Sequence, residues 1–266
     1  MDRLARSLLR LSTIVVLLFI YAPLALILVY AFNASGTSAW PPAGYTLRWV
    51  QDAIENTALR QALLTSIEAA LGATVLALML GTLAAIAVTR HRFFGRETIS
   101  FVVILPISLP GIVTGMALST SFATTGIPLG LFAIIVGHAT FSIVLVFNNV
   151  AARLRRTAQS LEEASGDLGA DSWQTFRYVT FPTIRTALLA GGLLAFALSF
   201  DEVIVTLFMA GGVKTLPIWI FESFRLARQV SLVNVVGLVA ILLSVIPVLV
   251  ASRLTQDSGG VTGARG

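Results

Sequence analysis

Long apolar runs place the strongest constraint on how this chain can fold. Six of them are long enough to cross a bilayer, because a transmembrane helix needs about 20 predominantly apolar residues. They cover residues 11–32, 63–89, 99–122, 129–150, 187–207 and 232–254. Of the 266 residues, 56% are hydrophobic and only 12% are charged, which indicates a membrane protein rather than a soluble domain. The sequence predicts an all-α polytopic membrane protein with six transmembrane helices in a single domain, residues 1–266.

Basic side chains lie mainly in one set of alternating loops. Arginines precede the first run, fill the loop at 90–97 and follow the fourth run at 153–156. Cytoplasmic loops carry an excess of Lys and Arg, so both termini and segment 160–182 are expected to be cytoplasmic. The net charge of +5 is therefore interpreted as a topology signal rather than a nucleic-acid site. The polar, glycine-rich tail at 255–266 is expected to be disordered.

Segment 160–182 is a polar insert between the fourth and fifth runs. The Ser160–Glu163 spacing is that of a capping box and predicts a helix start, and Gly169 suits a left-handed helix end. A second box at Asp171–Gln174 predicts another short helix. Pro182 is expected to bend the chain before the next span. Spacing alone is equally compatible with a partner-binding element and with a simple connector.

The residues of this segment match a known family. Glu163-Ala164-Ser165, then Gly169, then Val179-x-Phe181-Pro182 have the spacing of the EAA loop in the integral permease subunits of bacterial ABC importers. Ser165, Val179 and Phe181 are mild departures from that pattern. The likeness extends over residues 45–254 and most resembles the second permease of spermidine/putrescine-type importers, through the segments at 109–117, 137–150 and 199–206.

This resemblance implies a non-catalytic permease that forms half of a transport pathway in the bacterial cytoplasmic membrane. Its partners would be membrane lipid, a homologous permease, two ATPase subunits and an extracytoplasmic solute-binding protein, with no nucleic acid. The coupling loop would dock on the ATPase through Glu162, Glu163, Ala164, Ser165, Gly169, Ala170 and Pro182. The binding protein would meet outer segments that include residues 216–228, with Trp219 and Glu222.

No nucleotide or metal site is expected in the chain itself. The single lysine, Lys214, lies in Gly-Gly-Val-Lys-Thr, and Val213 stands where a phosphate-binding loop requires glycine. ATP and Mg²⁺ are therefore expected on the partner ATPase. Because the sequence has no cysteine, it can form no disulfide, thiolate metal site or cysteine nucleophile.

Asp201 and Glu202 are adjacent acidic residues in the fifth run. At about 1.5 Å per residue, Asp201 lies beyond the midplane of a helix that starts at residue 187. Ionisable groups at such depth are costly and usually face a bundle interior or a wet cavity. Neighbouring helical residues are about 100° apart, so one carboxylate is expected to line a pathway, with Phe200, while the other meets a partner helix or a backbone amide. The alternative is a polar anchor for helix packing.

The third run is interrupted by Pro106 and Pro110. Broken backbone at membrane depth is tolerated only inside protein or along a cavity, so Pro110, Gly111 and Thr114 are candidate pathway residues. Close helix packing at small residues is the alternative. His138, in the fourth run, is interpreted as a hydrogen-bonded packing residue rather than a proton relay.

The acidic stretch resembles polyamine permeases and implies a small cationic solute such as putrescine or spermidine. Many of those permeases have an acid directly after the third-run proline, where this chain has Gly111. A shorter diamine such as putrescine and a zwitterion such as 4-aminobutyrate therefore both remain open. An ion-coupled carrier often shows inverted repeats, which the sequence lacks. An intramembrane hydrolase needs converging carboxylates, which neighbours on one helix do not provide.

Overall fold

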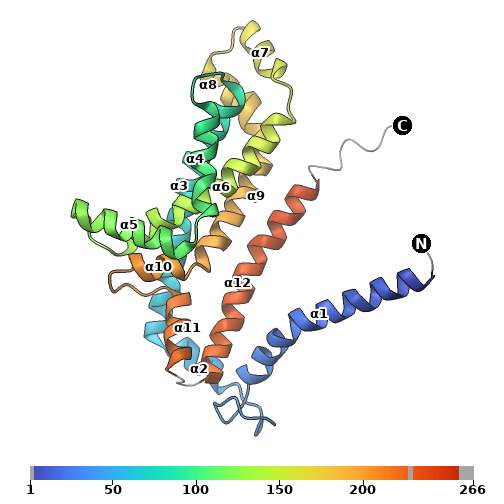
Figure 1. Ribbon diagram of the computed structural model, residues 1–266, viewed down its shortest axis with the longest axis vertical. Helices are drawn as coiled ribbons and strands as arrows, with labels where there is room; N and C mark the ends of the chain where they lie inside the picture. Colours follow the sequence, from blue (N-terminus) through green and yellow to red (C-terminus); the bar gives the residue numbers. More distant parts are fainter. Residues whose placement is uncertain (1–2, 227–229, 258–266) are drawn as a thin grey trace. The chain divides into compact units, whose positions relative to one another are not determined.

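The computed structural model describes residues 3–226 and 230–257, and every named element within them is helical. The elements are α1 (Arg3–Ala31), α2 (Arg48–Glu55), α3 (Thr57–Arg90), α4 (Arg96–Ser108), α5 (Gly111–Thr125), α6 (Leu131–Arg155), α7 (Ser160–Asp167), α8 (Ser172–Thr175), the π-helical turn η1 (Phe176–Thr180), α9 (Phe181–Phe200), α10 (Ile204–Met209), α11 (Leu216–Arg225) and α12 (Val230–Asp257) (Figure 1). The described residues within Met1–Arg60 and Trp219–Leu242 form one compact unit, and those within Gln61–Ile218 and Leu243–Gly266 form a second.

The first unit is organised around Asn33, which follows α1. Its buried backbone carbonyl accepts hydrogen bonds from Trp49 Nε1 at 2.8 Å and from Ser231 Oγ at 3.2 Å. Buried backbone groups need such partners because an unpaired one is costly. Trp49, Leu232 and Val235 pack with the end of α1 as a small core. Most side chains of α1 that precede this core are exposed, as expected of an apolar helix that contacts lipid.

The second unit is built on closely packed helices. Helices α6 and α9 lie side by side, and α4 and α10 also pack on α6 (Figure 1). A Cβ atom on Gly191 of α9 would lie 3.1 Å from the Cα of Val146. One on Gly81 of α3 would lie 2.9 Å from the carbonyl oxygen of Ile143. Small residues thus allow the backbones of α3 and α9 to approach α6, which places the core of this unit around α6.

Four of the six predicted spans are continuous helices. Helices α1, α3, α6 and α12 match the first, second, fourth and sixth runs, with shifted ends. The interruption predicted in the third run is confirmed, since α4 and α5 meet at a bend of 108°. Pro106 is accommodated inside α4, whereas the break falls at Leu109 and Pro110, because a residue before proline is disfavoured in the helical conformation.

The fifth predicted span, residues 187–207, is present as a membrane-length helix, but the helix does not continue to residue 207. Helix α9 ends at Phe200, and the short α10 follows after three residues. The predicted disordered tail needs a correction too, because α12 continues through Asp257. The rest of that tail, residues 258–266, lies outside the described residues.

The loop at 160–182 contains both predicted short helices. The second capping box is confirmed, since Asp171 Oδ1 accepts from the amide of Gln174 at 2.8 Å and Gln174 Oε1 accepts from the amide of Asp171 at 2.9 Å. The first box is wrong: α7 begins at Ser160, but the residue before it is already helical and makes no side-chain cap bond. Gly169 has the predicted left-handed conformation, with φ of +86°.

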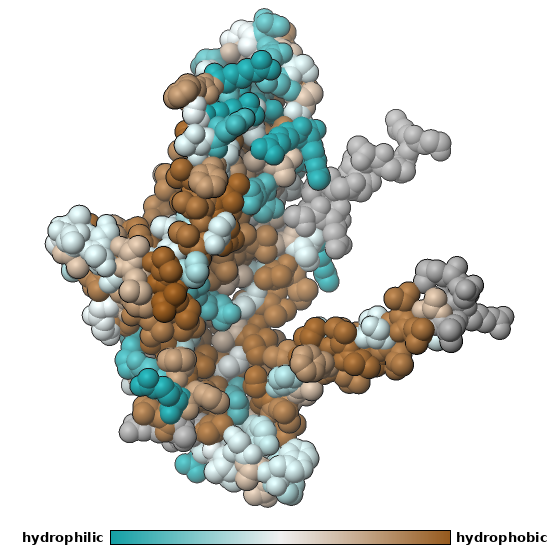
Figure 2. All heavy atoms as spheres, in the orientation of Figure 1, coloured by the Kyte–Doolittle hydropathy of each residue, from teal (hydrophilic) through white to brown (hydrophobic). Residues whose placement is uncertain are grey.

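The predicted bend at Pro182 is wrong. Residues Ser172–Phe200 form one continuous helical stretch, in which the π-helical turn η1 precedes α9. Proline is tolerated in the first turn of a helix, and the wider turn before it removes the need for a break. The polar loop forms a hydrophilic end of the second unit, whereas the long helices are apolar (Figure 2).

Candidate functional site

The acidic pair lies at the break between α9 and α10. Asp201 follows the last residue of α9, and its amide still donates to the carbonyl of Ala197 at 3.3 Å. Glu202 Oε1 accepts from the amide of Val205 at 2.9 Å and so caps the first turn of α10. The pair therefore does not lie on one continuous helix, but the expectation that one carboxylate meets a backbone amide is confirmed by Glu202.

His138 of α6 fixes both sides of this break. Its Nδ1 lies 2.8 Å from Ser199 Oγ in α9, and its Nε2 lies 2.8 Å from Thr206 Oγ1 in α10. The Thr206 hydroxyl donates to the carbonyl of Glu202 at 2.8 Å, so it has to accept from Nε2. Nδ1 is then left to accept from the Ser199 hydroxyl. All three side chains are buried, so the predicted burial and hydrogen bonding of His138 are confirmed, while its assignment to packing rather than proton relay stays a prediction.

Asp201 differs from its neighbour because it is exposed. Its carboxylate has no hydrogen-bond or ion-pair partner among the residues that the structure describes. Phe200, which was predicted to line a pathway with it, is 2% exposed and stacks on Phe196 with ring centroids 5.9 Å apart. Phe200 is therefore a packing residue in this structure, and Asp201 is the candidate for contact with a solute.

The break in the third run lies next to the acidic break. A Cβ atom on Gly111, the first residue of α5, would be 3.6 Å from Ile204, the first residue of α10. One turn further, a Cβ on Gly115 would be 2.7 Å from the ring of Phe208. Thr114 Oγ1 is buried and has no partner among the described residues. Tertiary packing thus brings Pro110, Gly111 and Thr114 close to the segment that carries the acidic pair.

The predicted coupling residues fall into two groups. Glu163, Ala164, Gly169 and Pro182 are exposed, and Ala170 is partly exposed. Glu162, in contrast, forms an ion pair inside the unit, and the Ser165 hydroxyl lies 3.1 Å from that of Thr175 in α8. The first group is free to meet a partner, whereas Glu162 and Ser165 stabilise the loop itself.

Large apolar side chains are exposed on the same loop, and none of them is among the predicted coupling residues. Leu168 is 90% exposed, and Tyr178 and Trp173 are exposed by 75% and 68%. Contiguous exposed apolar patches mark protein interaction sites, which makes these three side chains candidates for contact with a partner. The available signal was the presence of these residues in an otherwise polar insert, outside any membrane-length run.

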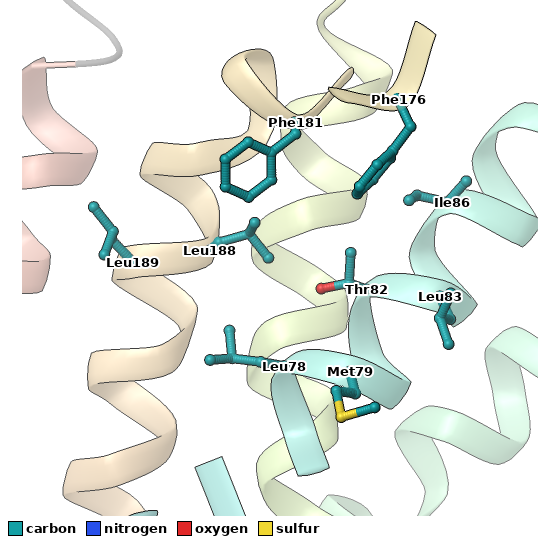
Figure 3. Close-up of a pocket in the computed structure, with 9 residues that line it drawn as sticks. All are labelled: Leu78, Met79, Thr82, Leu83, Ile86, Phe176, Phe181, Leu188 and Leu189. Carbon is teal, nitrogen blue, oxygen red and sulfur yellow. The ribbon is translucent and has the colours of Figure 1, made fainter. Parts of the chain in front are cut away.

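An apolar pocket of about 430 Å³ lies between α3, η1 and α9 (Figure 3). Phe176 and Phe181 line one side, Leu188 and Leu189 belong to α9, and the α3 residues Leu78, Met79, Thr82, Leu83 and Ile86 complete it. A cation needs opposite charge or hydrogen-bond acceptors when it leaves water. This lining has a single hydroxyl and no charge, so the pocket does not suit a cationic solute.

The predicted docking residues Trp219 and Glu222 lie on α11, and both are partly exposed. Trp219 also packs against the core of the first unit. Their role in docking stays a prediction. Arg228, at the end of the predicted outer segment 216–228, lies outside the described residues.

Residues 77–257 match the family of binding-protein-dependent transport system inner membrane components. The chain is 34% identical over 217 residues to the putrescine transport system permease protein PotI of Escherichia coli (strain K12), covering 78% of this chain and 76% of that protein. It is 30% identical over 241 residues to the spermidine/putrescine transport system permease protein PotC of Escherichia coli (strain K12), covering 90% of each.

Solved structures show the same fold. A bacterial ABC transporter involved in the import of the acidic polysaccharide alginate matches with a TM-score of 0.68 and 18% identity, over 97% of this chain and 98% of that chain. The MetNI methionine ABC transporter, in inward-facing conformations, matches with a TM-score of 0.59 and 17% identity, over 75% of this chain and 93% of that chain. These two transporters are described for unrelated solutes, an acidic polysaccharide and methionine, so the fold does not specify what is transported.

The apolar helices, the polar loop and these likenesses define an integral permease of the ABC importer class. The chain belongs to the family of binding-protein-dependent transport system inner membrane components, and it is a multi-pass protein of the inner membrane.

Proposed function

We propose that the chain forms half of the membrane pathway of an ATP-driven importer for a small cationic solute, a polyamine such as putrescine or spermidine. The two relatives that are named for putrescine and for spermidine/putrescine support this solute class. The observation that carries the proposal is the carboxylate of Asp201, which is exposed at a helix break and unpaired among the described residues.

Asp201 has the charge and the position that a cation pathway requires. A cation that leaves water loses hydration free energy, and a nearby opposite charge offsets part of that loss. Irregular backbone at membrane depth is tolerated inside protein or along a cavity, and the exposure of Asp201 favours a cavity here. Two such breaks, at Pro110 and at Asp201, are adjacent because Gly111 approaches Ile204. The Asp201 carboxylate would meet an ammonium group of the solute there.

We assign ATP hydrolysis and the first binding of the solute to partner subunits. The exposed residues of the 160–182 loop would dock on one of two ATPase subunits, which bind ATP and Mg²⁺. A homologous permease would supply the other half of the pathway, and an extracytoplasmic binding protein would deliver the solute. In this arrangement the loop and both termini are cytoplasmic, as the basic residues favour.

The test is ATP-dependent uptake of radiolabelled putrescine into liposomes that contain the complete transporter. Asp201→Asn preserves shape but removes the charge, and Glu202→Gln is the matched control because its amide oxygen can still accept from Val205. A hydrogen bond to a charged group contributes about 1.5–3 kcal/mol, so Asp201→Asn should lower uptake roughly 10- to 100-fold. Glu202→Gln should cause a much smaller loss.

Assembly yield and solute binding to the extracytoplasmic protein are measured on the same preparations. If Asp201→Asn assembles and imports putrescine at the wild-type rate, the acidic pathway is wrong. If the variant instead fails to assemble, Asp201 is a structural anchor. ATP-independent uptake driven by a proton or sodium gradient would favour an ion-coupled carrier.

A zwitterion such as 4-aminobutyrate is the second candidate solute. The observation that favours it is Gly111, which leaves Asp201 without a second acid at the third-run break. One carboxylate matches one ammonium group, whereas a diamine has two. Calorimetry of the binding protein with a panel of amines and amino acids distinguishes the two solutes.

A further inference from the structure

A second charged cluster lies where α3 ends beside the polar loop. Arg90, the last residue of α3, places its Nε 3.0 Å from Oε2 and 3.1 Å from Oε1 of Glu162 in α7. Only 8% of the Arg90 side chain and 19% of the Glu162 side chain are exposed. One guanidinium N–H is thus shared by both carboxylate oxygens, in a charge-assisted contact that is stronger than a hydrogen bond between neutral groups.

The pair also contacts two further segments. Thr180 of η1 donates its hydroxyl hydrogen to Glu162 Oε1 at 3.1 Å. Arg90 Nη2 donates to the carbonyl of Thr157, in the turn between α6 and α7, at 3.5 Å. One ion pair therefore connects α3, α7, η1 and the α6–α7 turn. Turns with π-helical geometry such as η1 occur frequently at functional sites.

We propose that the Arg90–Glu162 pair transmits movement of α7 to α3, which makes Arg90 a positioning residue for the coupling of ATP hydrolysis to transport. This inference rests on the proposed function, since it requires that the loop follows the ATPase subunit. When α7 moves, Glu162 draws Arg90 and the end of α3 with it. Helix α3 packs closely on α6 at Gly81, so its displacement reaches the core of the second unit.

Glu162 is poorly placed to bind the ATPase directly. Both of its oxygens have partners inside the unit, and its side chain is mostly covered. Glu163, the next residue, is exposed instead. The two adjacent acids thus have different environments: Glu163 lies on the surface of the loop, and Glu162 contacts α3.

The test compares Arg90→Met, Glu162→Leu and the double variant in the complete reconstituted transporter. The matched control is Asp167→Asn, which removes one exposed acid from the same helix. Removing one member of a largely buried pair leaves the other charge uncompensated, whereas removing both is often nearly neutral for stability. The readout is putrescine imported per ATP hydrolysed, normalised to assembled complex.

We expect this ratio to fall about tenfold in each single variant, within the usual range for coupling between sites. It should fall by the same factor in the double variant, because either change alone already breaks the connection. Arg90→Lys keeps the charge but cannot make all the guanidinium contacts, so it should assemble and lose part of the ratio. Asp167→Asn should retain the wild-type ratio.

Three results would overturn the proposal: a double variant with the wild-type ratio, an Arg90→Lys variant with the wild-type ratio, or uncoupling by Glu162→Leu but not by Arg90→Met. The last would mean that Glu162 contacts the ATPase. Failure of the proposed function is seen separately, as wild-type transporter without ATP-dependent uptake or as normal coupling in Glu163→Lys, and it overturns both conclusions.

Discussion

The second unit contains two polar clusters that are stabilised in different ways. At the loop end, Arg90 and Glu162 form an ion pair that retains some exposure. At the break between α9 and α10, His138, Ser199 and Thr206 are almost fully buried. The imidazole of His138 is hydrogen-bonded to the hydroxyls of the other two, and no ion pair is involved. Both clusters connect elements that are distant in the sequence, but only one of them uses charge.

The difference follows from the cost of removing charge from water. The free-energy cost of removing two charges from water offsets much of the Coulomb attraction in a buried ion pair. That cost is smaller where the pair stays in contact with some water. Inside an apolar bundle, satisfied hydrogen bonds fix geometry without that cost. The neutral cluster also leaves the charge of Asp201 uncompensated, whereas the loop cluster neutralises Glu162. Of these two acids, Asp201 therefore stays unpaired among the described residues, whereas Glu162 does not.

The largest effect on stability is expected at the neutral cluster. His138→Leu leaves the buried hydroxyl of Ser199 without its imidazole partner, at about 1–3 kcal/mol for an unsatisfied group, whereas the Thr206 hydroxyl keeps its bond to the carbonyl of Glu202. We expect a lower yield of assembled protein and a lower thermal midpoint in detergent. Ser142→Ala is the control one turn away, because its buried hydroxyl has no partner among the described residues. Unchanged stability of His138→Leu would contradict this role.

A second variant at His138 distinguishes a packing role from a role in proton transfer. His138→Gln keeps one donor and one acceptor, so it should recover part of the stability that His138→Leu loses. A proton relay requires a group that can be protonated, which an amide is not. Recovery of both assembly and uptake by His138→Gln supports packing, whereas recovery of assembly without uptake favours a relay.

A smaller effect is expected at the loop surface. Gly169 has φ of +86°, so Gly169→Ala introduces left-handed strain of about 1–2 kcal/mol. Gly166→Ala is the matched control, since this position is helical and has open space around it. Uptake and ATPase stimulation should fall for Gly169→Ala and stay unchanged for Gly166→Ala. Equal behaviour of the two variants would remove the requirement for the left-handed turn.

The smallest effect on activity is expected from single cysteine substitutions at two exposed positions of the second unit, which test the topology. The chain has no cysteine, so single cysteines at the exposed Gln159 and Gly212 give clean probes. An impermeant thiol reagent added to intact cells should label Gly212→Cys and not Gln159→Cys. Labelling of Gln159→Cys from outside would place the loop on the wrong side for an ATPase.

The sequence by itself determined the helical class, four of the spans and much of the loop. These features depend on local causes: the length of apolar runs, the Asp171–Gln174 capping box and the left-handed residue at Gly169. The prolines indicated an interruption of the third run, but not the 108° bend. Motif spacing also identified the acidic pair, although its place on a continuous helix was wrong.

Only the tertiary structure decided how the acidic residues are used. The break after α9 is fixed by His138, which lies 61 residues before Ser199 and 68 before Thr206. Glu162 is withdrawn from the loop surface by Arg90, 72 residues earlier. Hydrogen bonds and ion pairs between such distant positions leave no local pattern, because their energy depends on which helices pack together. Packing therefore separated Asp201 from Glu202 and Glu163 from Glu162, where the sequence showed only adjacent acids.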